Sequence, residues 1–139
     1  MKKEFSTKWK ASKKPRKQRK FRANAPLHLK KKFMSVGLSK ELKKKYSKRN
    51  IPVKKGDAVK IMRGKFKGKK GKVLEVKLKV GKIIIEGIQV KKQDGSNVAV
   101  KIQPSNLQIT ELNLDDKNRV KKLSSKEEKT EEKPKENKK

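Results

Sequence analysis

Apolar positions change their spacing along the chain, and the change separates two kinds of structure. From residue 51 to 114 aliphatic and β-branched residues alternate with polar ones. This period of two is typical of strands with one buried face. A short, nearly continuous β run, KIIIEGI, occupies 82–88. The alternating sets are Val59 and Ile61; Leu74, Val76, Leu78 and Val80; Val98, Val100 and Ile102; and Leu107 and Ile109.

Turn-forming residues punctuate these runs and indicate how the strands connect. Gly81 follows one run, Asp94 and Gly95 separate two others, and Pro104 precedes the last. Asp-Gly between two β runs is a strong hairpin signal. A handful of short strands in about sixty residues is too little for a two-layer sandwich, whereas a small bent barrel hides both faces and edges. We therefore expect a mainly β fold, with an SH3-like barrel over 51–114.

The segment 24–50 has helical rather than alternating spacing. Pro26 suits the first position of one short helix, and Ser39 suits the N-cap of a second. Leu42 and Tyr46 are four residues apart and would share one face of that second helix. Helices this short need a surface to pack against.

The two ends of the chain are polar, and each has its own charge pattern. Residues 1–22 hold eleven Lys and Arg with one acid, Glu4, so we expect 1–23 to be a basic extended arm, disordered on its own. Residues 115–139 hold seven acids among ten Lys and Arg. This composition predicts a disordered tail, with no ordered apolar anchor from residue 123 onwards.

The overall charge of the chain indicates which kind of partner it binds. The 139 residues include 45 Lys and Arg against 14 Asp and Glu, a formal net charge of +31, and 30% are hydrophobic. Such an excess calls for a polyanion, most commonly nucleic acid. The absence of cysteine excludes disulfides and thiolate metal sites. No apolar stretch approaches about 18 residues, so we expect a soluble, intracellular protein without membrane insertion.

The stretch from Arg63 to Lys72 carries far more charge than a hairpin turn requires. It holds six Lys or Arg residues, together with Gly64, Gly68 and Gly71. Glycine permits positive φ and close approach of the backbone to a ligand. Cations could contact phosphates while the ring of Phe66 stacks on a base. The alternative is a solvated hairpin loop with Phe66 folded back into the core.

Candidate chemistry beyond this loop is sparse. His28 is the only histidine, and zinc needs three or four protein ligands. No Ser-His-Asp order, P-loop or GxSxG motif is present. We expect no metal, no cofactor, no small-molecule substrate and no enzymatic activity. His28 is then either a polar or stacking contact to RNA or simply exposed, and Trp9 and Phe21 either stack on bases or sit in a mobile arm.

The segment 53–88 resembles a KOW motif, the short RNA-binding hairpin of ribosomal proteins and of transcription elongation factors of the NusG kind. It reads VKKGDAVKIMRGKFKGKKGKVLEVKLKVGKIIIEGI. The flanks, RKQRKFRANAPLHLKKKFMSVGLSKELKKKYSKRNIPVKKGD and IQPSNLQITELNLDD, are similar to a universal family of large-subunit ribosomal proteins. That family is the twenty-fourth in the bacterial numbering, in its archaeal and eukaryotic form. The match covers about residues 5–120, and the compact loop GKFKGKKGKV favours the archaeal type.

The resemblance implies a structural constituent of the large ribosomal subunit in the cytoplasm. Its members bind the 5′ region of the large-subunit rRNA early in assembly and lie near the peptide exit tunnel, so the implied partners are rRNA and neighbouring ribosomal proteins. Carried onto this chain, rRNA contact is expected at Lys13, Lys14, Arg16, Lys17, Arg19, Lys20, Arg22, His28, Lys30, Lys31, Lys32, Arg49, Arg63, Lys65, Phe66, Lys67, Lys69, Lys70 and Lys72.

Two other classes of protein share some of these features. A KOW-bearing transcription factor should carry a separate α/β domain before the KOW unit, but here only about fifty residues precede it, and they are rich in Lys and Arg and too polar for a domain core. A generic chromatin or membrane-surface polycation would need a basic amphipathic helix or low-complexity arms without a barrel. The alternating pattern over 51–114 argues against that class.

Overall fold

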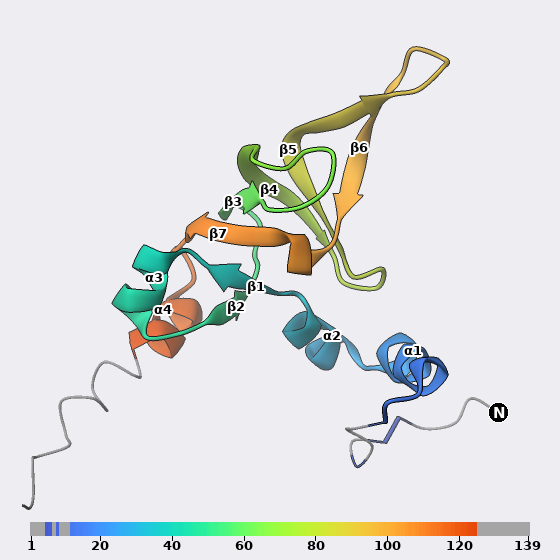
Figure 1. Cartoon of the computed structure of the whole chain (residues 1–139). Coiled ribbons are helices and arrows are strands. Elements are labelled where there is room, and N and C mark those ends of the chain that lie inside the picture. The colour runs from blue at the N-terminus through green and yellow to red at the C-terminus, as the bar shows by residue number, and fades with distance from the viewer. Residues whose placement is uncertain (1–4, 7, 9–11, 125–139) are drawn as a thin grey trace, which may run out of the picture.

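The computed structural model describes residues 5, 6, 8 and 12–124. Its main feature is one mixed sheet of seven strands in the order β2-β1-β7-β3-β4-β5-β6, with short helices around it (Figure 1). The strands are β1 (Ser35–Leu38), β2 (Asn50–Pro52), β3 (Ala58–Ile61), β4 (Lys70–Lys77), β5 (Lys82–Lys91), β6 (Asn97–Ile102) and β7 (Leu107–Glu111). The helices are α1 (Pro15–Asn24), α2 (Leu27–Phe33), α3 (Lys40–Tyr46), the 3₁₀ turn η1 (Pro104–Asn106) and α4 (Lys117–Ser124).

The helices begin and end where the local chemistry favours it. In α3 the Ser39 hydroxyl accepts a hydrogen bond from the Leu42 amide at 3.3 Å, which confirms the predicted N-cap. Ser47 ends that helix in the left-handed conformation, with φ of 48°. Pro26 precedes α2 as its N-cap rather than occupying its first position.

Helix α1 corrects the expectation of an extended arm for residues 15–23, while 1–4, 7 and 9–11 lie outside the described residues. Pro15 stands in its first turn, and long unbranched Lys, Arg and Gln side chains follow without a β-branched residue. These residue types lose little side-chain freedom in a helix. Local propensity therefore favours a helix even though none of its residues is buried.

Strand β1 lies inside the segment 24–50, where the sequence indicated two short helices and no strand. It pairs antiparallel with β2 and parallel with β7, where Gly37 lies opposite Gln108 and Leu38 opposite Ile109. Val36 and Leu38 are fully buried, so β1 carries an alternating pattern. With four residues, that pattern is too short to stand out in the sequence. The parallel pairing makes the sheet mixed.

The mainly β class is confirmed, but the expected barrel is not closed. Strands β2 and β6 stand at the two ends of the strand order and do not pair with each other. β2 has only three residues, and the long β5–β6 hairpin extends away from it (Figure 1). The sheet bends instead at irregularities in register within the β3–β7, β4–β5 and β5–β6 pairs.

One hydrophobic cluster fills the bend of the sheet. Its fully buried members include Met34, Val36, Leu38, Val59, Ile61, Val73, Ile83, Ile85, Ile88 and Ile109. Most of these residues come from β1, β3, β4, β5 and β7, and Met34 comes from the end of α2. The core therefore ties the N-terminal segment to the later strands.

The alternation predicted over residues 74–80 is confirmed only in part, because Val76 and Leu78 pack against the hydrophobic cluster whereas Leu74 and Val80 are exposed. The register of β4 shifts between Val73 and Glu75, so Val73 is buried while Leu74 is 47% exposed. The strand ends at Lys77, and Val80 lies in the following turn with 62% of its surface exposed. A single bulge exchanges the two faces of a strand, which the sequence pattern does not reveal.

The beginning of the expected disordered tail is ordered. Helix α4 spans Lys117–Ser124, and its Arg119 and Leu123 are both buried. Arg119 pairs with buried Asp57, and Leu123 joins the hydrophobic cluster. These two anchors correct the expectation for residues 117–124, while 125–139 lie outside the described residues.

Candidate nucleic-acid interface

The loop between β3 and β4 is held in shape by its own backbone. The Ile61 amide donates to the Lys69 carbonyl at 2.9 Å, and the Gly68 amide donates to the Ile61 carbonyl at 2.8 Å. Gly64 and Gly68 have φ of +89° and +88°, which confirms the positive φ expected for these two. The loop is therefore a defined turn rather than a slack connection.

Gly71 belongs to a strand and not to the loop. It lies in β4, and its φ is not positive. An added Cβ would lie 2.7 Å from the Glu86 carbonyl oxygen and 2.8 Å from the Ile85 Cγ2. Glycine is needed there because β4 and β5 approach closely, which corrects the loop-forming role expected from the sequence.

The charged side chains of this loop all point to solvent. Those exposed in the loop and the start of β4 are Arg63, Lys65, Lys67, Lys69, Lys70 and Lys72. Phe66 is half-buried and packs against the hydrophobic cluster, while the Lys69 Nζ lies 5.5 Å from the centroid of its ring. The ring is thus partly folded back, and the cations form the accessible part of the loop.

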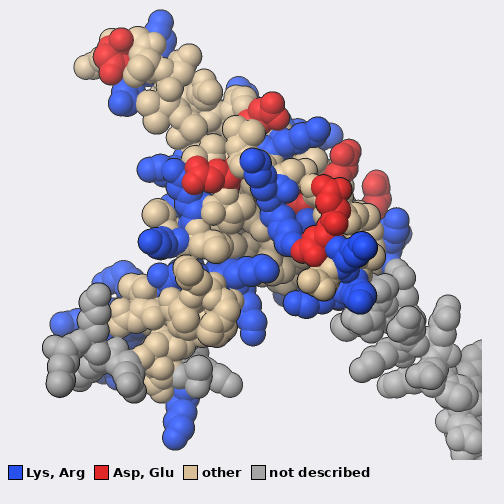
Figure 2. All heavy atoms as spheres, turned by 180° about the vertical axis from the view of Figure 1, so that it is seen from behind, with Lys and Arg blue, Asp and Glu red and all other residues tan. Residues whose placement is uncertain are grey.

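The N-terminal helices add a second set of cations. No acidic residue occurs between Glu4 and Glu41, and in Figure 2 the Lys and Arg side chains of this region stand without acidic neighbours. The side chains predicted to contact rRNA in α1, in α2 and near them are exposed apart from half-buried Lys30; they are Lys13, Lys14, Arg16, Lys17, Arg19, Lys20, Arg22, His28, Lys31, Lys32 and Arg49.

Phe21 has an intramolecular partner in the structure. Its ring centroid lies 4.9 Å from that of Phe5 and 6.1 Å from that of Phe33. This aromatic row links α1 to α2. Trp9, the other aromatic residue considered in the arm, lies outside the described residues.

The described residues offer little support for other kinds of site. His28 is exposed on α2, and within residues 5–6, 8 and 12–124 no group of three or more His, Cys, Asp or Glu could hold a metal ion. None of the helices in this part of the chain is both long and apolar enough to cross a membrane.

A hollow of about 340 Å³ beside the loop contains residues that sequence reasoning missed. It lies between the loop residues Arg63 to Phe66 and the end of β6. Lys82, Lys101, Gln103 and Asn106 contribute to its lining. Lys82 and Gln103 adjoin the turn residues Gly81 and Pro104, and that adjacency was the signal available in the sequence.

Two comparisons relate this chain to ribosomal proteins. Residues 12–126 match the family model for eukaryotic ribosomal protein L26 and its archaeal counterpart. The chain is also similar to the large ribosomal subunit protein uL24 of Methanothrix thermoacetophila. The two are 53% identical over 110 residues, which is 79% of this chain and 95% of that relative.

Proposed function

The chain belongs to the family of ribosomal proteins that comprises L26 of eukaryotes and its archaeal counterpart, and we propose that it is a structural, rRNA-binding constituent of the large ribosomal subunit. Family membership confirms the resemblance found in the sequence, including its archaeal type. The family is one of ribosomal proteins and not of enzymes.

The observation that carries the proposal is the combination of a rigid glycine loop with exposed cations. The loop between β3 and β4 is fixed by backbone hydrogen bonds and two positive-φ glycines, so the backbone that carries its cations has a defined shape before RNA binds. Lys and Arg contacts to phosphates supply most of the affinity of such interfaces. The acid-free helices α1 and α2 supply a second set of exposed cations.

The finer parts of the proposal rest on the resemblance. One part is that β3 to β7 form an SH3-like KOW unit. Another is that the chain binds the 5′ region of the large-subunit rRNA. Early assembly, a place near the peptide exit tunnel and contact with neighbouring large-subunit proteins belong to the same proposal.

A salt titration tests the role of the loop. Replacing Lys65, Lys67, Lys69 and Lys70 by Gln removes four exposed cations while the backbone hydrogen bonds remain. Binding to a 5′ fragment of the large-subunit rRNA should weaken. The slope of log K against log salt should flatten by about 0.7–0.9 for each phosphate that the variant no longer neutralises. Anisotropy titrations at four salt concentrations measure both quantities.

The matched control removes the same charge elsewhere. Lys40, Lys43, Lys44 and Lys45 are exposed on α3, and Gln suits a helix. This quadruple variant should keep a steeper slope and tighter binding than the loop variant. Equal losses in the two variants would show a general effect of net charge, and a loop variant that binds like the wild type would place the RNA contact elsewhere.

A further inference from the structure

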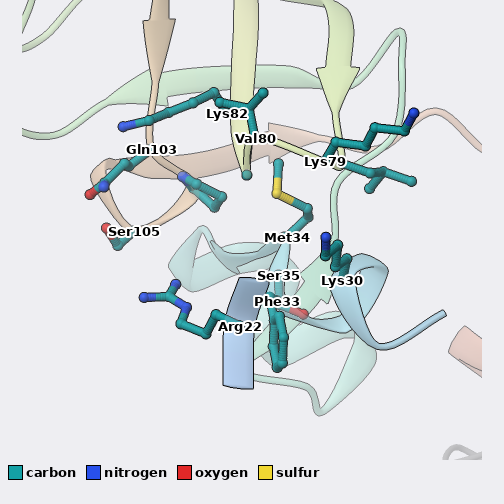
Figure 3. Close-up of a pocket in the computed structure, with 13 residues that line it drawn as sticks. Arg22, Lys30, Phe33, Met34, Ser35, Lys79, Val80, Lys82, Gln103 and Ser105 are labelled. Atoms are coloured by element: carbon teal, nitrogen blue, oxygen red, sulfur yellow. The ribbon is translucent and has the colours of Figure 1, made fainter. Parts of the chain in front are cut away.

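A groove of about 510 Å³ lies between the N-terminal helices on one side and the β4–β5 turn and η1 on the other (Figure 3). Four stretches of chain line it: the end of α1, the segment from α2 into β1, the turn between β4 and β5, and η1 with the residue before it. Its volume falls within the range of about 300–1,000 Å³ that is usual for ligand sites. The groove is thus created by tertiary structure alone.

The charges of the groove favour an anion. Its lining includes the cations Arg22, Lys30, Lys79 and Lys82 and contains no acidic residue. In Figure 3 Arg22 lies on one side of the opening, with Lys82 and Gln103 on the other. The polar ends of these three side chains and of Ser105 lie toward the same side of the view. Cations with an amide and a hydroxyl can hydrogen-bond both phosphate and base edges.

The groove also has an apolar wall that a simple phosphate would not need. Val80 stands in it with 62% of its surface exposed, next to Leu78 and Met34. Exposing so much of a valine beside several lysines leaves apolar area that a ligand can cover. Phe33 also lines the groove, but its ring packs toward Phe21. The apolar contact available to a ligand is therefore mainly aliphatic.

The groove neighbours the hollow beside the loop of the proposed rRNA interface. Lys82 and Gln103 line both this groove and the hollow beside Arg63 to Phe66. An RNA strand lying along the loop would therefore pass the mouth of the groove. A paired base within a duplex cannot enter such a recess, whereas an unpaired nucleotide can be splayed out into it.

We propose that this groove holds one unpaired nucleotide of the bound rRNA, with its base against Val80 and its phosphate between Arg22 and Lys82. The inference rests on the proposed rRNA binding and adds a second mode of contact. The loop contacts backbone phosphates, and the groove selects a place where the RNA has an unpaired base. Gln103 and Ser105 supply the hydrogen-bonding groups that meet the base or the ribose.

The test uses the full chain and a protein-free 5′ fragment of the large-subunit rRNA. Val80→Asp places a carboxylate on the apolar wall, and Val98→Asp is the matched control on β6, where Val98 is 42% exposed. Without its contact to the base, Val80→Asp should bind about tenfold or more weakly than the wild type. Binding by Val98→Asp should stay within about threefold of wild type. Acylation of ribose 2′-hydroxyls then reads the RNA nucleotide by nucleotide.

The wild type should change the reactivity of an unpaired nucleotide, and Val80→Asp should lose that change while keeping the changes due to the loop. Val80→Ser, which adds no charge, should lose it too and keeps the test valid should the aspartate variant unfold. Equal binding and equal reactivity patterns for the wild type and the Val80 variants would overturn the proposed nucleotide site in the groove and leave the proposed function standing. Changes confined to paired nucleotides would also overturn it. A wild type that fails to bind the fragment would overturn both proposals.

Discussion

The guanidinium of Arg119 and the carboxylate of Asp57 form a buried, two-pronged ion pair that joins α4 to the start of β3. Arg119 Nη1 donates to Asp57 Oδ1 at 2.6 Å, and Nη2 donates to Oδ2 at 2.8 Å. The two side chains are 5% and 0% exposed. The backbone amides of Lys54 and Asn113 also donate to this carboxylate, at 2.8 and 3.0 Å. Asp57 thus connects three separate segments of the chain.

Removing Arg119 should therefore destabilise the whole domain. Arg119→Ala leaves the Asp57 carboxylate buried with only its two backbone donors, and breaking a buried pair in this way costs about 3–5 kcal/mol. Urea unfolding followed by circular dichroism measures the free energy of unfolding. Lys117→Ala, at an exposed position of the same helix, is the control and should change it by no more than about 0.5 kcal/mol. A loss below about 1 kcal/mol for Arg119→Ala would show that the pair does not hold α4.

Truncation before α4 should lower the free energy of unfolding, whereas truncation after α4 should leave it unchanged. A chain that ends at Asp116 lacks both Arg119 and Leu123, and Leu123 is 3% exposed in the hydrophobic cluster. Its unfolding free energy should fall by more than that of Arg119→Ala, because burial of a leucine contributes a further 1.5–3 kcal/mol, roughly. A chain that ends at Ser124 keeps both anchors and should unfold at the wild-type urea concentration. Equal stability of the two truncated chains would contradict this prediction.

Replacing Gly68 or Gly71 by alanine should destabilise the protein, for a different reason at each position. A Cβ at Gly68 meets nothing within 4 Å, so Gly68→Ala costs only the backbone strain of φ +88°, about 1–3 kcal/mol, and its effect should stay in the loop. A Cβ at Gly71 collides with the backbone of Glu86, so Gly71→Ala should push β4 and β5 apart. Hydrogen exchange of the β4 and β5 amides distinguishes the two. It should accelerate throughout the pair for Gly71→Ala and at the loop alone for Gly68→Ala.

Lys54 should titrate below an ordinary lysine. Desolvation first, and then the positive charges of Lys31, Arg119 and Lys122, lower the pKa of its ammonium from 10.5, although the charge of Asp57 acts in the opposite direction. Lys54 also pairs with Asp116. NMR detection of the Lys54 Cε signal against pH measures this pKa. Lys31→Gln should raise it, because Lys31 makes the largest repulsive contribution.

The lowered pKa of Lys54 determines how its contribution to the free energy of unfolding changes with pH. The unfolded chain holds this proton more tightly than the folded chain. Stability relative to Lys54→Met should therefore rise with pH between the lowered pKa and 10.5, and level off above it. Urea unfolding of both chains across this range gives the difference. A fall across that range would mean that the pairing with Asp116 outweighs burial and repulsion.

The sequence by itself determined those features that depend on neighbouring residues. The alternation at Val59 and Ile61 and at Leu107 and Ile109 marked β3 and β7, because one face of each strand is buried and the period of two follows directly. Ser39 marked the start of α3 because an N-cap acts over three residues. The charge excess and the glycine-rich loop likewise indicated a polyanion partner without any knowledge of the fold.

Only the tertiary structure decided which distant residues meet. Arg119 is buried because Asp57, 62 residues earlier, lies opposite it; in the sequence it stands among charged residues that are typical of a solvated tail. Leu74 became exposed because a bulge after Val73 shifted the register of β4, and Val80 is exposed because the strand ends at Lys77 and leaves it in the following turn. The groove needs four segments that approach one another only after the sheet has formed. Burial of charge, register and cavity shape depend on long-range pairing, and local periodicity carries no information about the partner.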